Sequence, residues 1–324
     1  MAPWFGRRRL WIVGALFVVA CGTGAALDSL FGPGDNVKPR DGILAPAPPK
    51  VCTQWTVAGD DAGALTRFVV IGDYGSDGPI ERAVAELVTR WRPSFILTTG
   101  DNNYPRGEAS TIDANIGLHY HEYIGSYHGQ MGCGADRNRF FPALGNHDWL
   151  STGAQPYLDY FTLPGNERYY DVPWGDVHVF ALDSDGNEPD GIVADSAQAR
   201  WLKARLAAST ARWQVVYMHH PPYSSGPHGS SVQMRWPFKE WGADLVLAGH
   251  DHTYERLSID GLTYIVDGLG GASFYPMGEP VEGSLVRYTG TGGALLIEAD
   301  ATSLHARFQD ATGQTIDDLT LPPP

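Results

Sequence analysis

The chain has 324 residues, of which 43% are hydrophobic and 19% are charged, an ordinary balance for a soluble enzyme. This length can bury one sizeable hydrophobic core, in one large domain or in two. The formal net charge of −14 argues against nucleic acid as a partner, because no surplus of basic residues exists to neutralise its phosphates. The 39 glycines and 23 prolines indicate long loops on a sheet scaffold rather than a bundle of helices.

Residues 1–21 are typical of an export signal. Arg7-Arg8-Arg9 precede an apolar stretch, residues 10–19, that is too short to be a comfortable membrane span. The stretch ends in Val18-Val19-Ala20-Cys21, which resembles the bacterial lipobox, where the cysteine carries lipid. A plain signal peptide or an uncleaved anchor is the alternative. We therefore expect an exported protein, periplasmic or at the cell surface, lipid-anchored at Cys21.

Residues 22–50 are predicted to form a linker, because they are rich in glycine and proline and sustain no hydrophobic periodicity. Residues 51–324 contain no internal repeat and are predicted to form one domain. In an oxidising compartment Cys52 and Cys133 can form a disulfide, and two free buried thiols are the alternative. Neither cysteine has a partner at zinc-ligand spacing, so a structural zinc site is not expected.

From residue 66 onward, short apolar runs alternate with helical patterns, which predicts an α/β fold. Strands are expected at residues 67–71, 95–99, 140–144, 169–172, 177–182, 213–218 and 244–248, with two further strand pairs around 254–266 and 293–309. Helices are expected at residues 79–91, 111–128, 195–208 and 232–241. A hairpin turn is expected across Pro173-Trp174-Gly175-Asp176.

Possible metal ligands follow five of the predicted strands. They are Asp73; Asp101 with Tyr104; Asn146 with His147; His219; and His250 with His252. Taken singly, each has an ordinary structural explanation, because Asp and Asn after a strand usually cap a turn or a helix and a lone histidine usually packs. If these strands share a sheet and end at one edge, however, their side chains converge on one spot. The repetition therefore predicts a metal centre.

The motifs around these residues resemble those of the calcineurin-like metallophosphoesterase superfamily. They are, in family order, Gly72-Asp73-Tyr74-Gly75, Gly100-Asp101-Asn102, Gly145-Asn146-His147-Asp148, the strand-terminal His219, and Gly249-His250-Asp251-His252. Tyr104 is typical of the purple acid phosphatase branch, which includes the tartrate-resistant acid phosphatases and carries a GDxxY motif. The resemblance runs from about residue 66 to the last strands. It implies a four-layer α/β/β/α sandwich of two mixed β-sheets with a dinuclear metal centre at the strand ends.

The resemblance also implies which residues hold each of two metal ions. The first would be bound by Asp73, Asp101, Tyr104 and His252. The second would be bound by Asn146, His219, His250 and again Asp101. Ligand chemistry points the same way, because oxygen-rich ligation with a phenolate suits Fe(III), while two imidazoles and an amide suit a divalent Fe, Zn or Mn. Two such cations can clamp a phosphate and generate hydroxide near neutral pH.

Two histidines are expected to act on the substrate rather than on a metal. His147 would assist the leaving group, and His228 resembles the second substrate-side histidine of purple acid phosphatases, with a solvent-exposed loop histidine as the alternative. Asp148 and Asp251 are either partners that orient imidazoles or surface carboxylates. His220 precedes Pro221, and the sequence does not predict the orientation of its side chain. The histidines of the predicted aromatic helix, His119, His121 and His128, are expected to pack.

These residues together predict an exported phosphomonoesterase of purple acid phosphatase type. It would hydrolyse phosphate monoesters by metal-hydroxide attack and release inorganic phosphate, with the lipid anchor as its only membrane contact. A phosphodiesterase acting on cyclic nucleotides or phospholipid head groups is the alternative, because substrate choice depends on variable loops around such a site. A non-catalytic surface lipoprotein is a third possibility, although a degenerate protein is expected to lose ligands.

Overall fold

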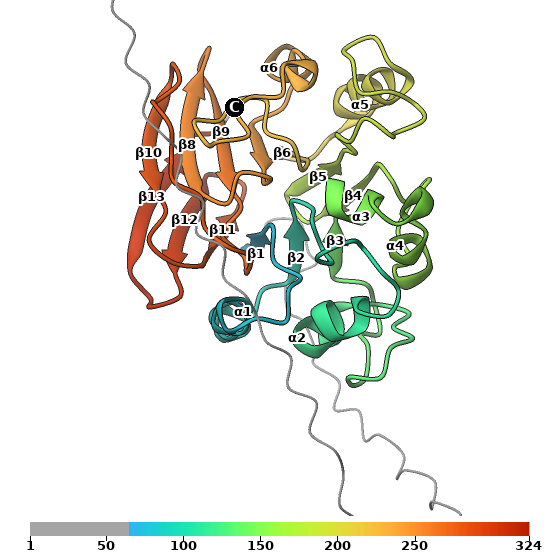
Figure 1. Cartoon of the computed structure of the whole chain (residues 1–324). Coiled ribbons are helices and arrows are strands. Elements are labelled where there is room, and N and C mark those ends of the chain that lie inside the picture. The colour runs from blue at the N-terminus through green and yellow to red at the C-terminus, as the bar shows by residue number, and fades with distance from the viewer. Residues whose placement is uncertain (1–64, 324) are drawn as a thin grey trace, which may run out of the picture. The chain divides into compact units, whose positions relative to one another are not determined.

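The computed structural model describes residues 65–323. Within this range, two mixed β-sheets pack together, with helices beside each of them (Figure 1). This architecture confirms the α/β sandwich that the sequence motifs imply. The predicted boundaries at residues 21 and 50 lie outside the described residues, as do Cys21 and Cys52, and the division into leader, linker and domain stays a prediction.

The first sheet has six strands in the order β13-β12-β11-β1-β2-β3. Their bounds are β1 Thr66–Ile71, β2 Phe95–Thr98, β3 Phe140–Pro142, β11 Gly293–Ala299, β12 Leu304–Asp310 and β13 Thr315–Leu321. Strands β1, β2 and β3 are parallel, whereas β11 pairs antiparallel with both β1 and β12. Strands β2 and β3 are buried throughout and β1 is buried except at Arg67, and the three consist mainly of apolar residues, as expected for strands covered on both faces.

The second sheet has seven strands in the order β10-β8-β9-β7-β6-β5-β4. Their bounds are β4 Tyr170–Trp174, β5 Val177–Ala181, β6 Trp213–Tyr217, β7 Leu245–Ala248, β8 Tyr254–Ile259, β9 Leu262–Asp267 and β10 Ser284–Tyr288. Strands β5, β6, β7 and β9 are parallel, and β4, β8 and β10 pair antiparallel with their neighbours. The carboxyl ends of β6 and β7 therefore lie at one edge.

Helices complete the layers. The α-helices are α1 Pro79–Trp91, α2 Leu118–Tyr120, α3 Asn146–Trp149, α4 Gln155–Tyr160, α5 Ala197–Ala208 and α6 Phe238–Trp241. Helix α1 begins with Pro79, which tolerates the first turn because its missing N–H needs no partner there. Leu202 and Leu206 of α5 and Phe238 of α6 join a buried cluster with the second sheet. Burial of each such side chain contributes about 1.5–3 kcal/mol.

Two predicted helices are wrong in extent. The helix predicted at 111–128 is a series of short turns, a π-helix Asp113–Gly117, α2 and a 3₁₀ turn His121–Tyr123, and the backbone is extended at Ile124. The helix predicted at 232–241 is divided into a 3₁₀ turn Val232–Met234 and the single turn of α6. Pro237 lies between the two pieces, where it has no N–H to donate and disfavours a helical residue before it.

The strand predictions missed β10 and β13, and the hairpin turn is shorter than expected. Pro173 and Trp174 belong to β4, so the turn consists of Gly175 and Asp176. Strand β13 is polar in sequence, which hides its strand character. Its Asp317 accepts hydrogen bonds from Arg256 Nε (2.6 Å) and Tyr254 (2.8 Å) of β8, so a tertiary partner stabilises this acidic strand.

Cys133 is disulfide-bonded. The free-thiol alternative is therefore wrong for this residue, and its partner lies outside the described residues. The region that the structure describes contains no helix with the length and apolar character needed to cross a membrane.

Candidate metal centre

The predicted ligands meet where the two sheets adjoin. Loops after β1, β2 and β3 of the first sheet carry Asp73, Asp101 with Tyr104, and Asn146; loops after β6 and β7 of the second sheet carry His219, His250 and His252. The convergence is therefore present, and it joins two sheets, as the predicted sandwich of two mixed β-sheets implies, rather than the ends of a single sheet. The first sheet supplies the oxygen donors, and the second supplies the imidazoles.

The loops from the two sheets approach each other closely. His219 Nδ1 lies 2.8 Å from the Thr99 carbonyl oxygen, and the His250 N–H donates to Asp73 Oδ2 at 2.8 Å. Gly100 has a φ of +94°, and a Cβ there would lie 2.7 Å from His219 Nδ1. Only glycine suits this position, because any side chain would collide with the imidazole ring.

Three residues of the site have a left-handed backbone conformation, which residues other than glycine rarely adopt. The φ angles are 54° at Asp73, 51° at Asp101 and 71° at His250. Such conformations cost free energy and cluster at functional sites, where the surrounding structure holds them in place. Here the backbone turns sharply after a strand, which directs each side chain into the space between the sheets.

A first group of donor atoms surrounds the Tyr104 hydroxyl. The phenolic oxygen lies 3.2 Å from Asp73 Oδ1, 3.0 Å from Asp101 Oδ2 and 3.1 Å from His252 Nε2. His252 Nε2 is also 3.4 Å from Asp73 Oδ1. Four donors from three loops thus face one point.

A second group surrounds His219 Nε2. This nitrogen lies 2.9 Å from Asn146 Oδ1, 3.1 Å from His250 Nδ1 and 3.5 Å from Asp101 Oδ2. The same Asp101 oxygen therefore belongs to both groups. Its other oxygen accepts the His147 N–H at 2.8 Å, which fixes the orientation of the carboxylate.

The donor set fits two metal ions. Metal–ligand bonds of about 2.0–2.2 Å place neighbouring donor atoms about 3.0–3.5 Å apart, which is the spacing in both groups. The Nδ1 atoms of His219 and His252 contact the carbonyl oxygens of Thr99 and Ser273. Because a carbonyl only accepts, each Nδ1 carries the hydrogen and each Nε2 presents a lone pair, as in ligating histidines.

The electrostatics of the site also favour cations. Burial, followed by the Asp73 and Asp148 carboxylates, raises the pKa of Asp101 well above its ordinary value. Burial, followed by Asp73 and Asp101, does the same to the pKa of Tyr104. Burial and the neighbouring His219 lower the pKa of His250 to about 2, so its imidazole stays neutral. A bound cation would stabilise the anionic oxygen donors and needs neutral imidazole.

His147 and His228 flank the two donor groups. His147 Nδ1 contacts the Pro105 carbonyl oxygen at 2.6 Å, so it carries the hydrogen, and Nε2 lies 3.9 Å from Asp101 Oδ2. The exposed His228 ring lies 4.4 Å from the His250 ring, centroid to centroid. Both side chains lie beside the donor atoms and are reached by solvent, His147 from the single turn of α3 and His228 from a loop.

Asp148 and Asp251 are both buried, so they are not surface carboxylates, and within residues 65–323 neither forms a hydrogen bond with an imidazole ring. Asp148 is 1% exposed, and its Oδ2 accepts the Gly145 N–H at 2.9 Å and an Asn102 amide hydrogen at 2.8 Å. Asp251 is fully buried and accepts hydrogen bonds from the Ser224 hydroxyl and the His228 N–H. The two carboxylates therefore brace the loops that carry Asp101 and His228.

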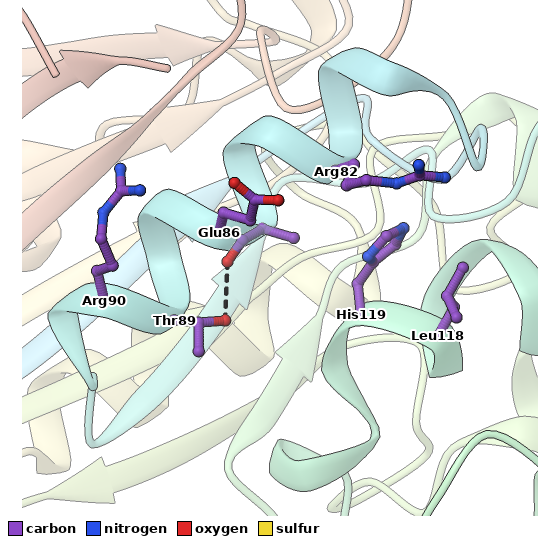
Figure 2. Close-up of a pocket in the computed structure, with 7 residues that line it drawn as sticks. Arg82, Glu86, Thr89, Arg90, Leu118 and His119 are labelled. Atoms are coloured by element: carbon purple, nitrogen blue, oxygen red, sulfur yellow. Dashed lines mark hydrogen bonds between the residues drawn. The ribbon is translucent and has the colours of Figure 1, made fainter. Parts of the chain in front are cut away.

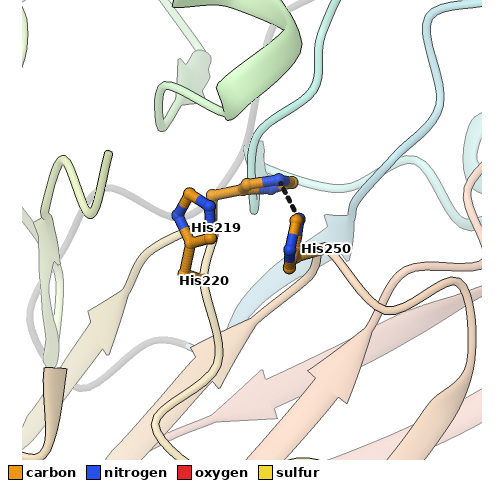
Figure 3. A group of neighbouring side chains, drawn as sticks. All are labelled: His219, His220 and His250. Carbon is orange, nitrogen blue, oxygen red and sulfur yellow. Dashed lines mark hydrogen bonds between the residues drawn. The ribbon is translucent and has the colours of Figure 1, made fainter. Parts of the chain in front are cut away.

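Two residues beside the site had no predicted role. The Tyr275 ring stacks on the His252 ring, with centroids 4.1 Å apart and planes inclined by 7°. His220 points into the site rather than away from it: one ring nitrogen lies within 4.8 Å of nitrogens of His219 and His250 (Figure 3). The adjacent ligand His219 was the only signal for His220 in the sequence, and nothing marked Tyr275.

A separate cavity of about 580 Å³ lies beside α1 and α2 (Figure 2). Its lining consists of Arg82, Ala85, Glu86, Thr89, Arg90, Leu118 and His119. None of the predicted ligands lines it. His119 thus borders a cavity, whereas His121 Nδ1 contacts the Cys133 carbonyl oxygen and its ring packs on Tyr127. His128 lies beyond the helical turns.

Comparisons with known proteins agree with this geometry. A family model described as calcineurin-like phosphoesterase matches residues 66–254. Purple acid phosphatase 17 of Arabidopsis thaliana is 25% identical over 240 residues, covering 64% of this chain and 69% of that protein. Purple acid phosphatase 3 of the same plant is 25% identical over 288 residues, covering 77% and 75%.

Solved structures share the fold. A purple acid phosphatase from yellow lupin seeds superposes with a TM-score of 0.67 at 17% identity, over 82% of this chain and 55% of that chain. The Plasmodium protein GAP50, described as the anchor in the inner membrane complex, has a TM-score of 0.63 at 20% identity, over 80% and 89%.

This chain belongs to the calcineurin-like phosphoesterase family, in its purple acid phosphatase-like branch. It is a phosphoric ester hydrolase, and a dinuclear metal centre is typical of its family. A phosphate ester as substrate is consistent with that membership, and a group of histidine and aspartate side chains suited to metal binding is present.

Proposed function

We propose that the protein is an exported phosphomonoesterase with two metal ions. Asp73, Asp101, Tyr104 and His252 would hold an Fe(III) ion. Asn146, His219, His250 and Asp101 would hold a divalent Fe, Zn or Mn. When bound, such ions neutralise phosphate oxygens and lower the pKa of water, so that hydroxide forms near neutral pH.

A single observation carries this proposal: Asp101 Oδ2 belongs to both donor groups, 3.0 Å from the Tyr104 hydroxyl and 3.5 Å from His219 Nε2. One shared oxygen supports two ions close together rather than one. The phenol supports a trivalent ion in the first position, because hard anionic oxygens favour it. The names of the plant relatives support phosphate monoesters as substrates.

His147 is proposed to stabilise or protonate the leaving oxygen of the ester. Its Nδ1 is held by the Pro105 carbonyl, which leaves Nε2 as the nitrogen able to exchange a proton with the substrate. His228 is proposed to bind the phosphate from the other side of the site, beside His250. Asp251 would keep this loop in place through the His228 N–H.

The test of the reaction compares an aryl phosphate with its bis-aryl diester, using the metal-loaded protein purified from an exporting host. We expect the monoester to be hydrolysed faster. Elemental analysis should give two metal ions per chain including iron, and the oxidised protein should be purple. A faster reaction with the diester would replace the phosphomonoesterase assignment, and a colourless protein with two zinc or two manganese ions would remove the tyrosinate–iron part.

The role of His147 is tested by the variant His147→Ala. We expect kcat to fall roughly 10²–10⁴-fold, because a positioned proton donor contributes about that much, while both metal ions stay bound. His305→Ala is the matched control, because His305 pairs with Asp318 on the surface of β12 and β13. Unchanged kcat in His147→Ala would remove this residue from the reaction.

Export and the lipid anchor at Cys21 are part of the proposal and rest on residues 1–21 alone. The test is mass spectrometry of the mature protein from its exporting host. We expect a diacylglycerol-modified cysteine at the new N-terminus. A mature chain that begins elsewhere, without lipid, would replace the anchor with an ordinary signal peptide.

A further inference from the structure

His220 is a further histidine of the site that neither the motifs nor the donor groups include. It follows His219 directly, and its ring lies 4.9 Å from the His219 ring and 4.4 Å from the His250 ring, measured between centroids. The His250 ring is therefore in contact with the His220 ring and also with the His228 ring, which is likewise 4.4 Å away. Figure 3 shows the rings of His219, His220 and His250 around one space.

Ser184, which follows β5, determines how the His220 ring can act. The Ser184 Oγ accepts the His220 backbone N–H at 2.8 Å and lies 3.0 Å from His220 Nδ1. Ser184 is 4% exposed, and its hydroxyl has no other hydrogen-bonding partner within residues 65–323. A buried hydroxyl hydrogen needs an acceptor, so Ser184 donates to Nδ1, and Nε2 of the neutral ring carries the hydrogen.

An imidazole with its hydrogen on Nε2 has no lone pair left for a metal ion. It can donate a hydrogen bond, and the anionic group that enters this space during the proposed reaction is phosphate. We propose that His220 is a phosphate-binding residue, which donates from Nε2 to a phosphate oxygen beside the second donor group while Ser184 fixes its tautomer and orientation. This inference rests on the proposed function and adds a third substrate-side histidine to His147 and His228.

The spacing agrees with this role. His219 Nε2 lies 2.9 Å from Asn146 Oδ1 and 3.1 Å from His250 Nδ1. One ring nitrogen of His220 lies within 4.8 Å of these two histidines, but within residues 65–323 it forms no hydrogen bond with either ring. The His220 ring therefore borders the second donor group without a direct hydrogen bond to it, which suits contact with an oxygen atom of the substrate. His220 therefore faces what the metal ions would bind rather than the ions themselves.

The experiment measures binding of inorganic phosphate to the metal-loaded full chain by calorimetry, together with metal content by elemental analysis. In His220→Ala we expect phosphate binding to weaken roughly tenfold or more, because a hydrogen bond to a charged group is lost, with two metal ions per chain retained. KM for an aryl phosphate should rise by a similar factor. Ser184→Ala should weaken phosphate binding severalfold in the same direction, and His305→Ala should change nothing.

Two results would overturn the inference. If His220→Ala loses the second metal ion, then His220 is a metal ligand; if phosphate binding and KM are unchanged, it has no role toward phosphate. Should His220→Ala not fold, His220→Gln and Ser184→Ala give the same test, since neither removes the bulk of the site. A wild-type protein that binds metal but neither phosphate nor an aryl phosphate would reject the proposed function as well, and this separates the two failures.

Discussion

The two sheets contribute different chemistry to the same site. Loops of the first sheet bring carboxylate, phenol and amide oxygens: Asp73, Asp101, Tyr104 and Asn146. Loops of the second sheet bring only imidazoles, from His219, His220, His250 and His252. Neither sheet has a complete donor group by itself, because the first group needs His252 and the second needs His219 and His250.

This division explains why packing between the sheets matters for function. A small change in how the sheets adjoin would separate oxygen donors from nitrogen donors without altering either set. Contacts between backbone groups of one sheet's loops and side chains of the other oppose such a change: the His250 N–H donates to Asp73 Oδ2, and His219 Nδ1 contacts the Thr99 carbonyl oxygen. The site is therefore a property of the interface between the sheets, and substitutions can test each side separately.

The largest effect is expected from Asp101→Ala, because this residue of the first sheet serves both donor groups. We expect loss of both metal ions and a fall in kcat/KM on the order of 10³-fold or more. The reason is that bound metal ions stabilise the charge of the transition state by several kcal/mol. Elemental analysis and kinetics measure the two outcomes. Loss of activity with both metal ions still bound would contradict the shared-oxygen assignment.

A narrower effect is expected from Tyr104→Phe, which removes one oxygen donor of the first sheet and keeps the ring. The first metal ion should bind at least roughly tenfold more weakly, and the visible band of the oxidised protein should disappear. The second ion should remain, because its oxygen and nitrogen donors are intact. A variant that keeps its colour would show that the phenol does not contact iron.

The close approach of the two sheets at Gly100 is tested by the variant Gly100→Ala. The new Cβ would lie 2.7 Å from His219 Nδ1, so we expect the free energy of unfolding to fall by about 1–3 kcal/mol. Gly153→Ala is the matched control, because Gly153 also has a positive φ, +64°, but has open space around it. Equal destabilisation in the two variants would mean that backbone strain alone, and not the contact between the sheets, lowers the free energy of unfolding.

The last effect changes only the pH dependence of stability, and it concerns a buried acid beside the first sheet. Glu81 of α1 accepts the N–H groups of Ser76 (2.9 Å) and Asp77 (2.6 Å), in the loop that follows Asp73. Burial raises the pKa of Glu81 from 4.5 to about 8, against the lowering effect of these two hydrogen bonds. Folding therefore favours the protonated acid between these two pH values.

Because the native state holds this proton more tightly than the unfolded state, the contribution of Glu81 to stability is complete below about pH 4.5. It is lost as the pH rises toward 8, by up to about 1.4 kcal/mol per pH unit. Glu81→Gln should remove this slope, which denaturant unfolding at several pH values measures. A variant with the same slope as the wild-type protein would assign the pH dependence to other groups.

Much of the fold and of the site follows from local sequence. Helix α1 begins and ends where its pattern predicts, at Pro79 and Trp91, and β2 differs from its prediction by one residue. The donor residues could be found because each follows directly after an apolar strand, so a short motif fixes both the strand end and the ligand. The helix predicted at 232–241 was wrong because its apolar pattern continues across Pro237, whose own chemistry interrupts a helix. Strand β13 was missed because its sequence is polar and its stabilising partners lie on β8.

The sequence by itself therefore determined which side chains are available and the order in which they occur, because strands and the turns after them depend on neighbouring residues. Tertiary structure decided which sheet supplies each residue, that a single Asp101 oxygen, Oδ2, belongs to both groups, and that His220 faces the site. The physical reason is that distances between loops depend on how the sheets pack, through contacts such as that between Gly100 and His219, which join residues far apart in the chain.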